Sequence, residues 1–136
     1  MTLVQVHAAA VCAWFGLVAG ETVMELCARD AASRRFVKTA HAWIDRLFEI
    51  PLIMVALFSG VMLLSQSWPA SPLLLAKVAC GLVAIAANFV CIPYVQMRAK
   101  ANDDVEVQRL TRNIIFTGSA IPFGLAAMVI GFGYLA

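Results

Sequence analysis

The stretch from Ala40 to Leu64 reads AHAWIDRLFEIPLIMVALFSGVMLL. It is longer than the roughly 20 residues that a helix needs to cross the hydrocarbon core of a bilayer. Its second half, from Pro51 onward, carries no charged side chain, but its first half contains His41, Asp45, Arg46 and Glu49. We therefore expect a membrane-spanning helix with ionisable groups inside its span, and such groups usually bear on function.

Three further segments have the same length and apolar character, and together with the first they predict an all-α fold. Of the 136 residues, 62% are hydrophobic and 13% are charged, whereas soluble domains carry about 25% charged residues. Because the connections are short, consecutive helices should lie antiparallel. We expect a single domain, residues 1–136, that is a polytopic membrane protein and a four-transmembrane-helix up-down bundle. Its helices should lie at about 3–27, 40–64, 72–97 and 113–135.

Basic residues are distributed unevenly over the connections between these helices. Eight of the ten Lys and Arg residues lie in 28–39 and 98–112, whereas the connection 65–71 contains none. Basic connections stay on the cytoplasmic side of a membrane. We therefore expect a multi-pass protein of a bacterial inner (plasma) membrane, with loops 28–39 and 98–112 cytoplasmic and both termini periplasmic. A net charge of +2 gives no reason to expect a nucleic-acid partner.

Ionisable and amide side chains within the spans form the candidate site. Helical periodicity places the two glutamates of the first span on one face, and the i, i+4, i+8 ladder of the second span drifts across about 80°. At about 1.5 Å per residue, these groups reach similar depths in the cytoplasmic half. We expect one polar cluster inside the bundle. Its metal-binding candidates are Glu21, Glu25, His41, Asp45 and Glu49, with polar support from Asn88 and Asn113.

Four carboxylates so close together cannot all stay ionised and unpaired, because desolvation and mutual repulsion oppose it. A bound cation or several protons would resolve this conflict. Imidazole with carboxylates is a suitable ligand set for iron, manganese or zinc. For Glu25 and His41, which lie close to the expected interface, the alternative is that they are hydrated and cap helix ends.

Two basic side chains, His7 and Lys77, should lie apart from this cluster, near the outer face. His7 is a candidate axial haem ligand, because haem-binding bundles take imidazoles from their helices. Alternatively it is an interfacial histidine bonded to a loop. Lys77 could pair with an anion such as a haem propionate, or extend to the outer surface.

Small residues in the spans suggest packing rather than chemistry. Gly16 and Gly20 form a GxxxG on the side of the first span opposite the polar stripe, which predicts a helix-packing or homo-oligomer face. The four cysteines show no CxxC pair, and each lies in an apolar stretch: Cys12, Cys27, Cys80 and Cys91. We expect them to be buried small hydrophobes.

The order of several features resembles a group of small four-helix membrane proteins. The first span contains HAAAVCAWFG (7–16), the second ends with FSGVMLL (58–64) and the third opens with LLLAK (73–77). This pattern is similar to that of HemJ-type protoporphyrinogen oxidases, CopD-type copper-resistance domains and their uncharacterised relatives. The resemblance implies haem b held by His7, with Lys77 as a partner. Where HemJ-type proteins continue with Leu-Pro-Arg-Leu, this chain has GETVME (20–25), which departs from the oxidase pattern.

Three functions follow from these observations. The first is an intramembrane haem b or transition-metal protein with a redox or metal-handling role, which would be a membrane oxidoreductase if the bound group is redox-active. The second is a proton-coupled transporter of a small cation that acts as an oligomer, since buried carboxylates can exchange protons for a cationic substrate. The third is a structural or assembly subunit whose polar groups serve only helix packing.

Overall fold

The computed structural model describes residues 1–134, and within them the chain is helical almost throughout. In chain order the elements are α1 (Leu3–Cys27), α2 (Ala31–Ile44), the π-helical turn η1 (Asp45–Glu49), α3 (Ile50–Gln66), α4 (Pro72–Lys100), α5 (Asp104–Thr117), the 3₁₀ turn η2 (Gly118–Ala120) and α6 (Ile121–Tyr134). Because η1 and η2 continue the helices on either side, the elements form four long rods. All four are long and apolar enough to cross a membrane: Leu3–Cys27, Ala31–Gln66, Pro72–Lys100 and Asp104–Gly133.

Three of the four rods are longer than the sequence predicts, and the connections are correspondingly shorter, whereas the first rod, Leu3–Cys27, has the predicted bounds. The second rod begins at Ala31 rather than Ala40, the third continues to Lys100, and the fourth begins at Asp104. The expected loops 28–39 and 98–112 are therefore wrong as loops, since helix occupies most of both. The predicted end of the fourth span at residue 135 lies outside the described residues.

Side-chain caps explain these early starts. The backbone N–H of Ser33 donates to Asp30 Oδ1 at 2.8 Å, and the N–H of Asp30 donates to Ser33 Oγ at 3.2 Å. At the start of α5 the N–H of Glu106 donates to Asp103 Oδ2 at 3.0 Å. Such caps satisfy backbone donors that the first turn leaves free, so polar turns continue the helices beyond their apolar parts.

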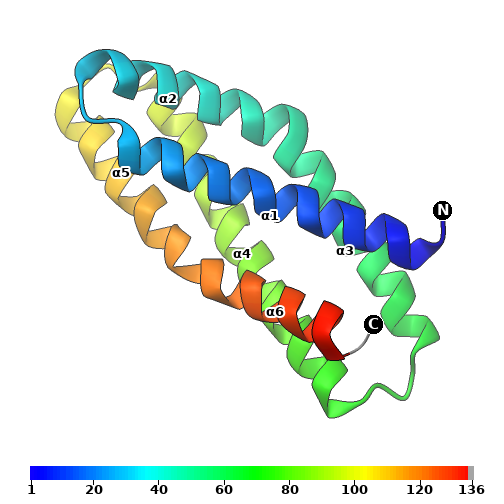
Figure 1. Cartoon of the computed structure of the whole chain (residues 1–136). Coiled ribbons are helices and arrows are strands. Elements are labelled where there is room, and N and C mark those ends of the chain that lie inside the picture. Colours follow the sequence, from blue (N-terminus) through cyan, green and yellow to red (C-terminus); the bar gives the residue numbers. More distant parts are fainter. Residues whose placement is uncertain (135–136) are drawn as a thin grey trace.

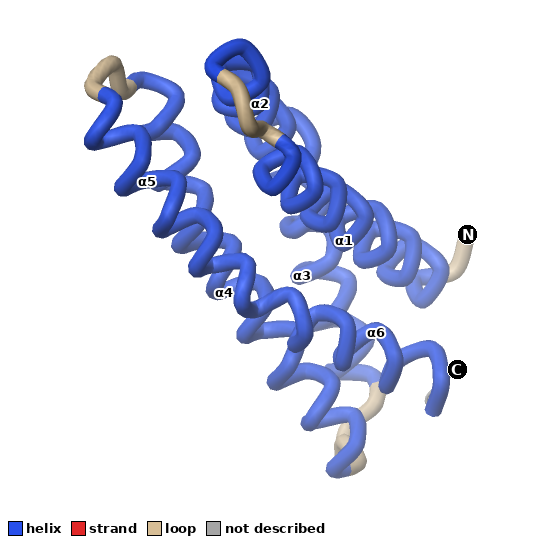
Figure 2. The backbone as a smooth tube through the Cα atoms, turned by 60° about the vertical axis from the view of Figure 1, so that its left-hand side comes forward, coloured by secondary structure: helices blue, strands red, loops and turns tan. Residues whose placement is uncertain are grey.

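The four rods divide into two groups that pack against each other. α1 packs along α3, α4 packs along α5 and α6, and α2 contacts α4. Figure 2 shows α1 to α3 on one side and α4 to α6 on the other. In Figure 1 both termini and the connection 67–71 lie at one end, whereas the connections 28–30 and 101–103 lie at the other.

The distribution of side chains is the reverse of that in a soluble protein. Large apolar side chains face outward, among them Phe36, Phe58 and Phe116, which are 68%, 63% and 78% exposed. Among the described residues the buried polar side chains are Glu21, His41, Asp45, Glu49, Ser59 and Arg98. The interior of the molecule is therefore where its charged chemistry lies.

The exposure of the four cysteines differs from what the sequence predicts. Cys12 and Cys27 are exposed, and Cys80 and Cys91 are only partly buried, so the prediction that the cysteines are buried is wrong. Small apolar residues can face outward here because large apolar side chains form much of the outer surface around them. Gly16 and Gly20 also face outward, and a Cβ added at either would meet nothing within 4 Å.

Candidate functional site

A π-helical turn in the second rod determines which way the side chains of His41, Asp45 and Glu49 point. The N–H of Ile50 donates to the carbonyl of Asp45, and Pro51 has no N–H with which to continue the α-helical pattern. A π turn advances less per residue than the 100° of an α-helix, which reduces the drift expected from the sequence. His41, Asp45 and Glu49 consequently all face inward, with 4%, 1% and 2% of their surfaces exposed.

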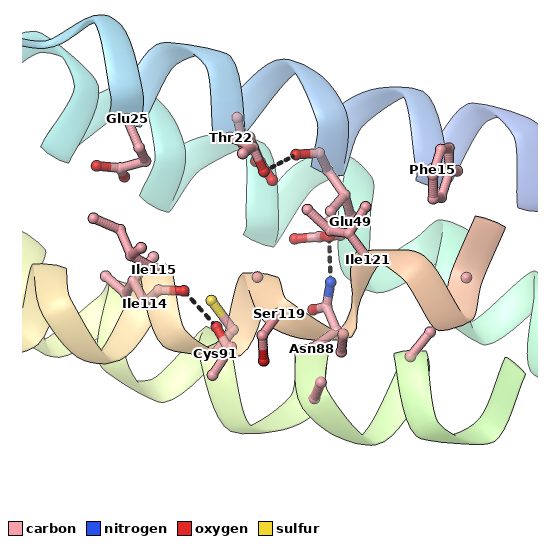
Figure 3. A pocket seen from close by; sticks show the side chains of 18 of the residues that line it. Phe15, Thr22, Glu25, Glu49, Asn88, Cys91, Ile114, Ile115, Ser119 and Ile121 are labelled. Atoms are coloured by element: carbon pink, nitrogen blue, oxygen red, sulfur yellow. Dashed lines mark hydrogen bonds between the residues drawn. The ribbon is translucent and has the colours of Figure 1, made fainter. Parts of the chain in front are cut away.

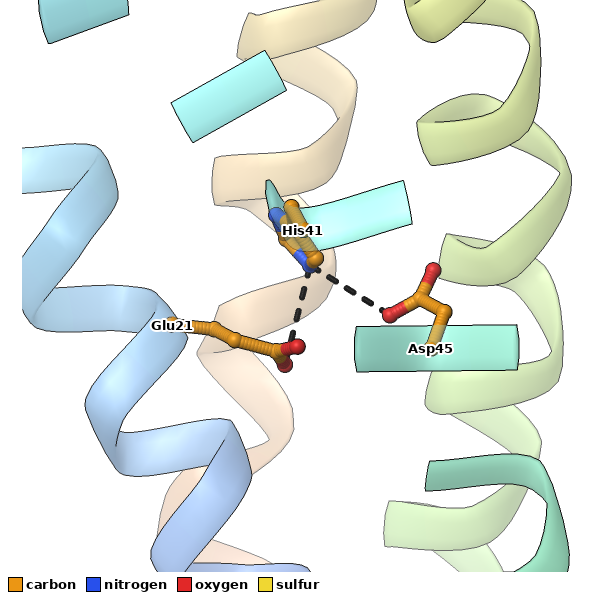
Figure 4. A group of neighbouring side chains, drawn as sticks. All are labelled: Glu21, His41 and Asp45. Carbon is orange, nitrogen blue, oxygen red and sulfur yellow. Dashed lines mark ion pairs between the residues drawn. The ribbon is translucent and has the colours of Figure 1, made fainter. Parts of the chain in front are cut away.

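His41 lies at the centre of the cluster, with carboxylates at both ring nitrogens. Its Nδ1 is 2.7 Å from Glu25 Oε1, and its Nε2 is 3.6 Å both from Glu21 Oε2 and from Asp45 Oδ1 (Figure 4). A carboxylate accepts, so in a neutral ring the 2.7 Å contact favours a proton on Nδ1, whereas Arg98 Nη2, which can only donate, lies 3.3 Å from the same nitrogen. The lone pair of Nε2 then points between the other two carboxylates.

The three groups around Nε2 are spaced as metal ligands are. Single donor atoms of Glu21, His41 and Asp45 lie within 4.8 Å of one another. Donors around a tetrahedral ion with bonds of 2.0–2.2 Å are separated by about 3.4 Å, and the two contacts of Nε2 measure 3.6 Å. The two contacts of His41 are therefore close to the separation of metal ligands.

Two of these carboxylates are also buried without partners. Glu21 Oε1 and both carboxylate oxygens of Asp45 make no hydrogen bond within the part of the chain that the structure describes. A buried polar atom without a partner is costly, and a buried charge far more so. Glu21 and Asp45 therefore have free valences that a cation, a proton or a water molecule would satisfy.

Glu25 is held by a cation that sequence reasoning missed. Arg98 of α4 is only 3% exposed. Its Nη1 donates to Glu25 Oε2 at 2.9 Å and to Thr111 Oγ1 at 3.2 Å, and its Nη2 donates to Glu25 Oε1. Glu25 in turn orients the ring of His41, as an outer carboxylate does for a metal-binding histidine.

The charge of Arg98 predicts a place in a cytoplasmic loop, and that prediction is wrong. Its position in the helix is nevertheless visible in the sequence, because Asn88, Cys91, Val95 and Arg98 follow one another at steps of three, four and three residues. These steps keep one face of an α-helix. Val95 and Arg98 are the two buried residues of α4.

Glu49 is also satisfied, by donors from two other helices. The indole N–H of Trp14 donates to Glu49 Oε1 at 3.0 Å. Asn88 Nδ2 donates to the same oxygen at 2.5 Å, as Figure 3 shows. Trp14 is 7% exposed and shares the inward face of α1 with Glu21. Helical spacing places Trp14 on this stripe but does not indicate its partner.

Asn113 and Arg46 do not join the cluster. Asn113 is only partly buried, and α5 instead turns Leu110 and Ile114 inward. One residue along a helix corresponds to a rotation of about 100° around its axis. Asn113 therefore lies one position from the inward-facing Ile114, and its side chain points away from the cluster. Arg46 lies on the outside, where its Nη2 donates to Gln96 Oε1 at 2.8 Å.

His7 and Lys77 lie away from the cluster. His7 Nδ1 is 3.0 Å from Ser59 Oγ and 3.1 Å from the carbonyl of Ala56. Its ring lies over Gly60, where a Cβ would be 3.1 Å from Cε1. His7 thus bonds to α3 rather than to a loop, and an accepting carbonyl at Nδ1 leaves Nε2 with its lone pair.

Lys77 is packed in a similar way against the fourth rod. A Cβ added at Gly131 would lie 2.8 Å from Lys77 Cε, so the side chain runs directly over this glycine. Neither His7 nor Lys77 lines either of the two cavities described for residues 1–134.

A cavity of about 380 Å³ adjoins the cluster, between α1 and the α4–α6 side of the molecule (Figure 3). Its polar wall includes Glu21, Glu25, His41, Glu49 and Asn88. The other walls are apolar or small, and the exposed side chains among its lining residues show that it reaches the outer surface: Leu26, Ile115 and Ser119. Asp45 lies behind the cavity and does not line it.

Charges in the cluster do not balance. With His41 neutral, the carboxylates of Glu21, Glu25, Asp45 and Glu49 outnumber the single guanidinium by three charges. A divalent cation would cancel two of these charges, whereas protons alone would have to occupy several carboxylates. The cluster is therefore suited to holding a cation or to exchanging protons.

Similarity to known proteins gives no independent assignment of these residues. The resemblance to HemJ-type and CopD-type proteins rests on three short segments, and of the candidate residues only His7 and Lys77 lie in them. Comparisons with protein-family models, with curated proteins and with solved structures found no match.

Proposed function

We propose that the chain is a multi-pass protein of a bacterial inner membrane, folded as an up-down bundle of its four rods. The length and apolar character of the rods and their outward-facing phenylalanines support insertion in a bilayer. Most Lys and Arg residues lie near the end that contains the connections 28–30 and 101–103. The positive-inside rule makes that end cytoplasmic and both termini periplasmic.

We propose further that Glu21, His41 and Asp45 bind a divalent transition-metal ion. The observation that carries this proposal is the convergence of His41 Nε2 with two buried carboxylates, each with oxygens that lack partners among the described residues. A set of one imidazole and two carboxylates suits iron, manganese or zinc. Glu25, held by Arg98, keeps the proton on Nδ1 and so keeps Nε2 available.

The role follows from which ion binds. Iron in this position would give a redox role, whereas manganese or zinc would give a metal-handling role. The ligands come from two rods that meet along their length, so an ion would also hold α1 against α2 and η1. Loss of the ion should therefore lower the free energy of unfolding of the bundle as well as abolish its redox or metal-handling role.

Metal analysis of the protein purified in a mild detergent tests the proposal. Wild-type protein reloaded with Fe²⁺, Mn²⁺ or Zn²⁺ should retain close to one ion per chain after desalting. Asp45→Asn should retain less than a tenth of that amount. Asp104→Asn removes an exposed carboxylate of α5 and should bind as wild type does. Equal metal content in wild type and Asp45→Asn would overturn the proposal.

Haem b at His7 is a separate hypothesis that the same sample tests. A visible spectrum of oxidised and dithionite-reduced protein would show a Soret band with α and β bands if haem were bound. His7→Ala should then abolish these bands. A colourless protein that holds an ion would leave the His41 cluster as the cofactor site, with His7 in a packing role.

A further inference from the structure

The cavity beside the cluster has features of a ligand site that the metal proposal does not use. Its volume of about 380 Å³ far exceeds the space that an ion needs and lies in the range of about 300–1,000 Å³ that is usual for small-molecule sites. It runs along α1 and reaches the outer surface on the apolar side of the molecule. A molecule dissolved in the bilayer could enter it without passing through water.

The charge of the lining points to a cation. The carboxylates of Glu21, Glu25 and Glu49 line the cavity, whereas no Lys or Arg of the described chain does. Glu21 is 5% exposed, and its Oε1 has no hydrogen-bond partner among the described residues. Carboxylates next to apolar walls attract an opposite charge strongly, because little water screens them.

Aromatic and small residues fit the same conclusion. Trp14 and Phe15 line the cavity next to these carboxylates, and aromatic rings attract organic cations through their faces. Phe15 closes one end of the cavity: a Cβ at Gly124 would lie 3.3 Å from Phe15 Cε2. At Gly118 an added Cβ would meet only Ile121 Cδ1, at 3.9 Å, so there is room for a larger side chain beside this glycine.

We infer that this cavity, which opens to the surface as a groove between α1 and the α5–α6 rod, binds a lipophilic monovalent cation: a quaternary ammonium or protonated amine with an apolar body. The charged head lies between Glu21 and Glu49, and the apolar body extends along Phe15 toward the bilayer. This binding requires no metal. Since Glu21 belongs to both sites, a bound divalent ion weakens binding of the organic cation.

A titration of the full-length protein, stripped of metals by a chelator in dodecyl maltoside, tests the inference. The probe is benzyltriethylammonium, and equilibrium dialysis measures its binding. We expect saturable binding of one probe per chain. A neutral analogue with carbon in place of the quaternary nitrogen should bind at least tenfold more weakly. Non-saturable binding, or equal binding of the neutral analogue, would overturn the inference.

Variants separate the groove from the metal site. Gly118→Leu fills the groove and should weaken probe binding at least tenfold. Gly81→Leu is the matched control, because Gly81 does not line the groove and a Cβ there meets nothing within 4 Å. Asp45→Asn should retain probe binding while losing metal, since Asp45 does not line the groove. Failure of the metal proposal would therefore leave this result unchanged.

Glu49→Gln gives a second test if Gly118→Leu does not fold. Glutamine keeps an oxygen that can accept from Trp14 and Asn88 but removes the charge. We expect at least a tenfold loss of probe affinity with the unfolding transition retained. Wild-type affinity in a folded Glu49→Gln or Gly118→Leu variant would show that the groove does not hold the cation.

Discussion

Removing the guanidinium of Arg98 should unfold this bundle more readily than any surface charge change. Arg98→Met keeps an unbranched apolar stem but deletes both donors to Glu25, whose side chain is 7% exposed. The carboxylate of Glu25 would then remain buried with only His41 as a partner. Breaking a buried ion pair on one side costs about 3–5 kcal/mol, and we expect a loss of this size in the free energy of unfolding.

A double-mutant cycle provides the assay. Unfolding in mixed dodecyl maltoside and dodecyl sulfate micelles gives the free energy for wild type, Arg98→Met, Glu25→Gln and the double variant. In the double variant the substituted glutamine keeps an oxygen for His41 and no charge is left unpaired, so most of the lost stability should return. Arg109→Met is the control, because its pair with Glu106 is 3.8 Å long and exposed, and exposed pairs contribute about 0–1 kcal/mol. A loss for Arg98→Met no larger than that for Arg109→Met would refute the reasoning.

Three smaller predictions concern single contacts. Trp14→Phe removes the hydrogen bond to Glu49 and should lower the free energy of unfolding by about 1.5–3 kcal/mol, measured by the same micelle titration. Gly60→Ala places a Cβ 3.1 Å from His7 Cε1 and should cost about 1–3 kcal/mol through overpacking; an unchanged transition would show that the ring moves aside freely. The pKa of Asp30 lies below its ordinary value, because the N–H at the third position of α2 donates to its carboxylate. The charged cap therefore stabilises α2 fully above the unfolded pKa, and this contribution is lost as the pH falls through the lower folded pKa. Asp30→Ala should speed amide exchange in the first turn of α2 at pH 6, and this effect should shrink as the pH falls below the folded pKa.

The number of helices could be predicted because each rod contains an apolar stretch long enough to cross a bilayer. Their ends could not be placed by hydropathy, since the first turns of α2 and α5 are polar. The capping signals at those turns were nevertheless present: Asp30 precedes Ser33 by three residues, and Asp103 precedes Glu106 by three. Helix starts in this chain are therefore determined by hydrogen bonds at the caps rather than by hydrophobicity.

The candidate site was harder to predict from the sequence than the helices were. The position of a residue along a helix is easier to infer than the direction in which its side chain points. The inward face of α1 follows from plain α-helical spacing. The ladder of the second rod needed the π turn at Asp45–Glu49, which single-residue spacing does not reveal. A basic residue next to a connection is readily assigned to that connection, so the sequence does not place Arg98 in the site. Asn113 matches the site in its position along the helix, but its neighbour Ile114 takes the inward position.

The four carboxylates of the cluster divide into two kinds, and this division argues against a purely structural role. Glu25 and Glu49 are satisfied by donors from other helices, as packing alone would require. Glu21 and Asp45 are also buried, but they keep oxygens without partners among the described residues. Neutral polar residues could join the helices at lower cost, because a buried unpaired carboxylate opposes folding. The chain holds two carboxylates firmly and leaves two with free oxygens beside the ring of His41, an arrangement that suits binding of a cation and that packing alone does not need.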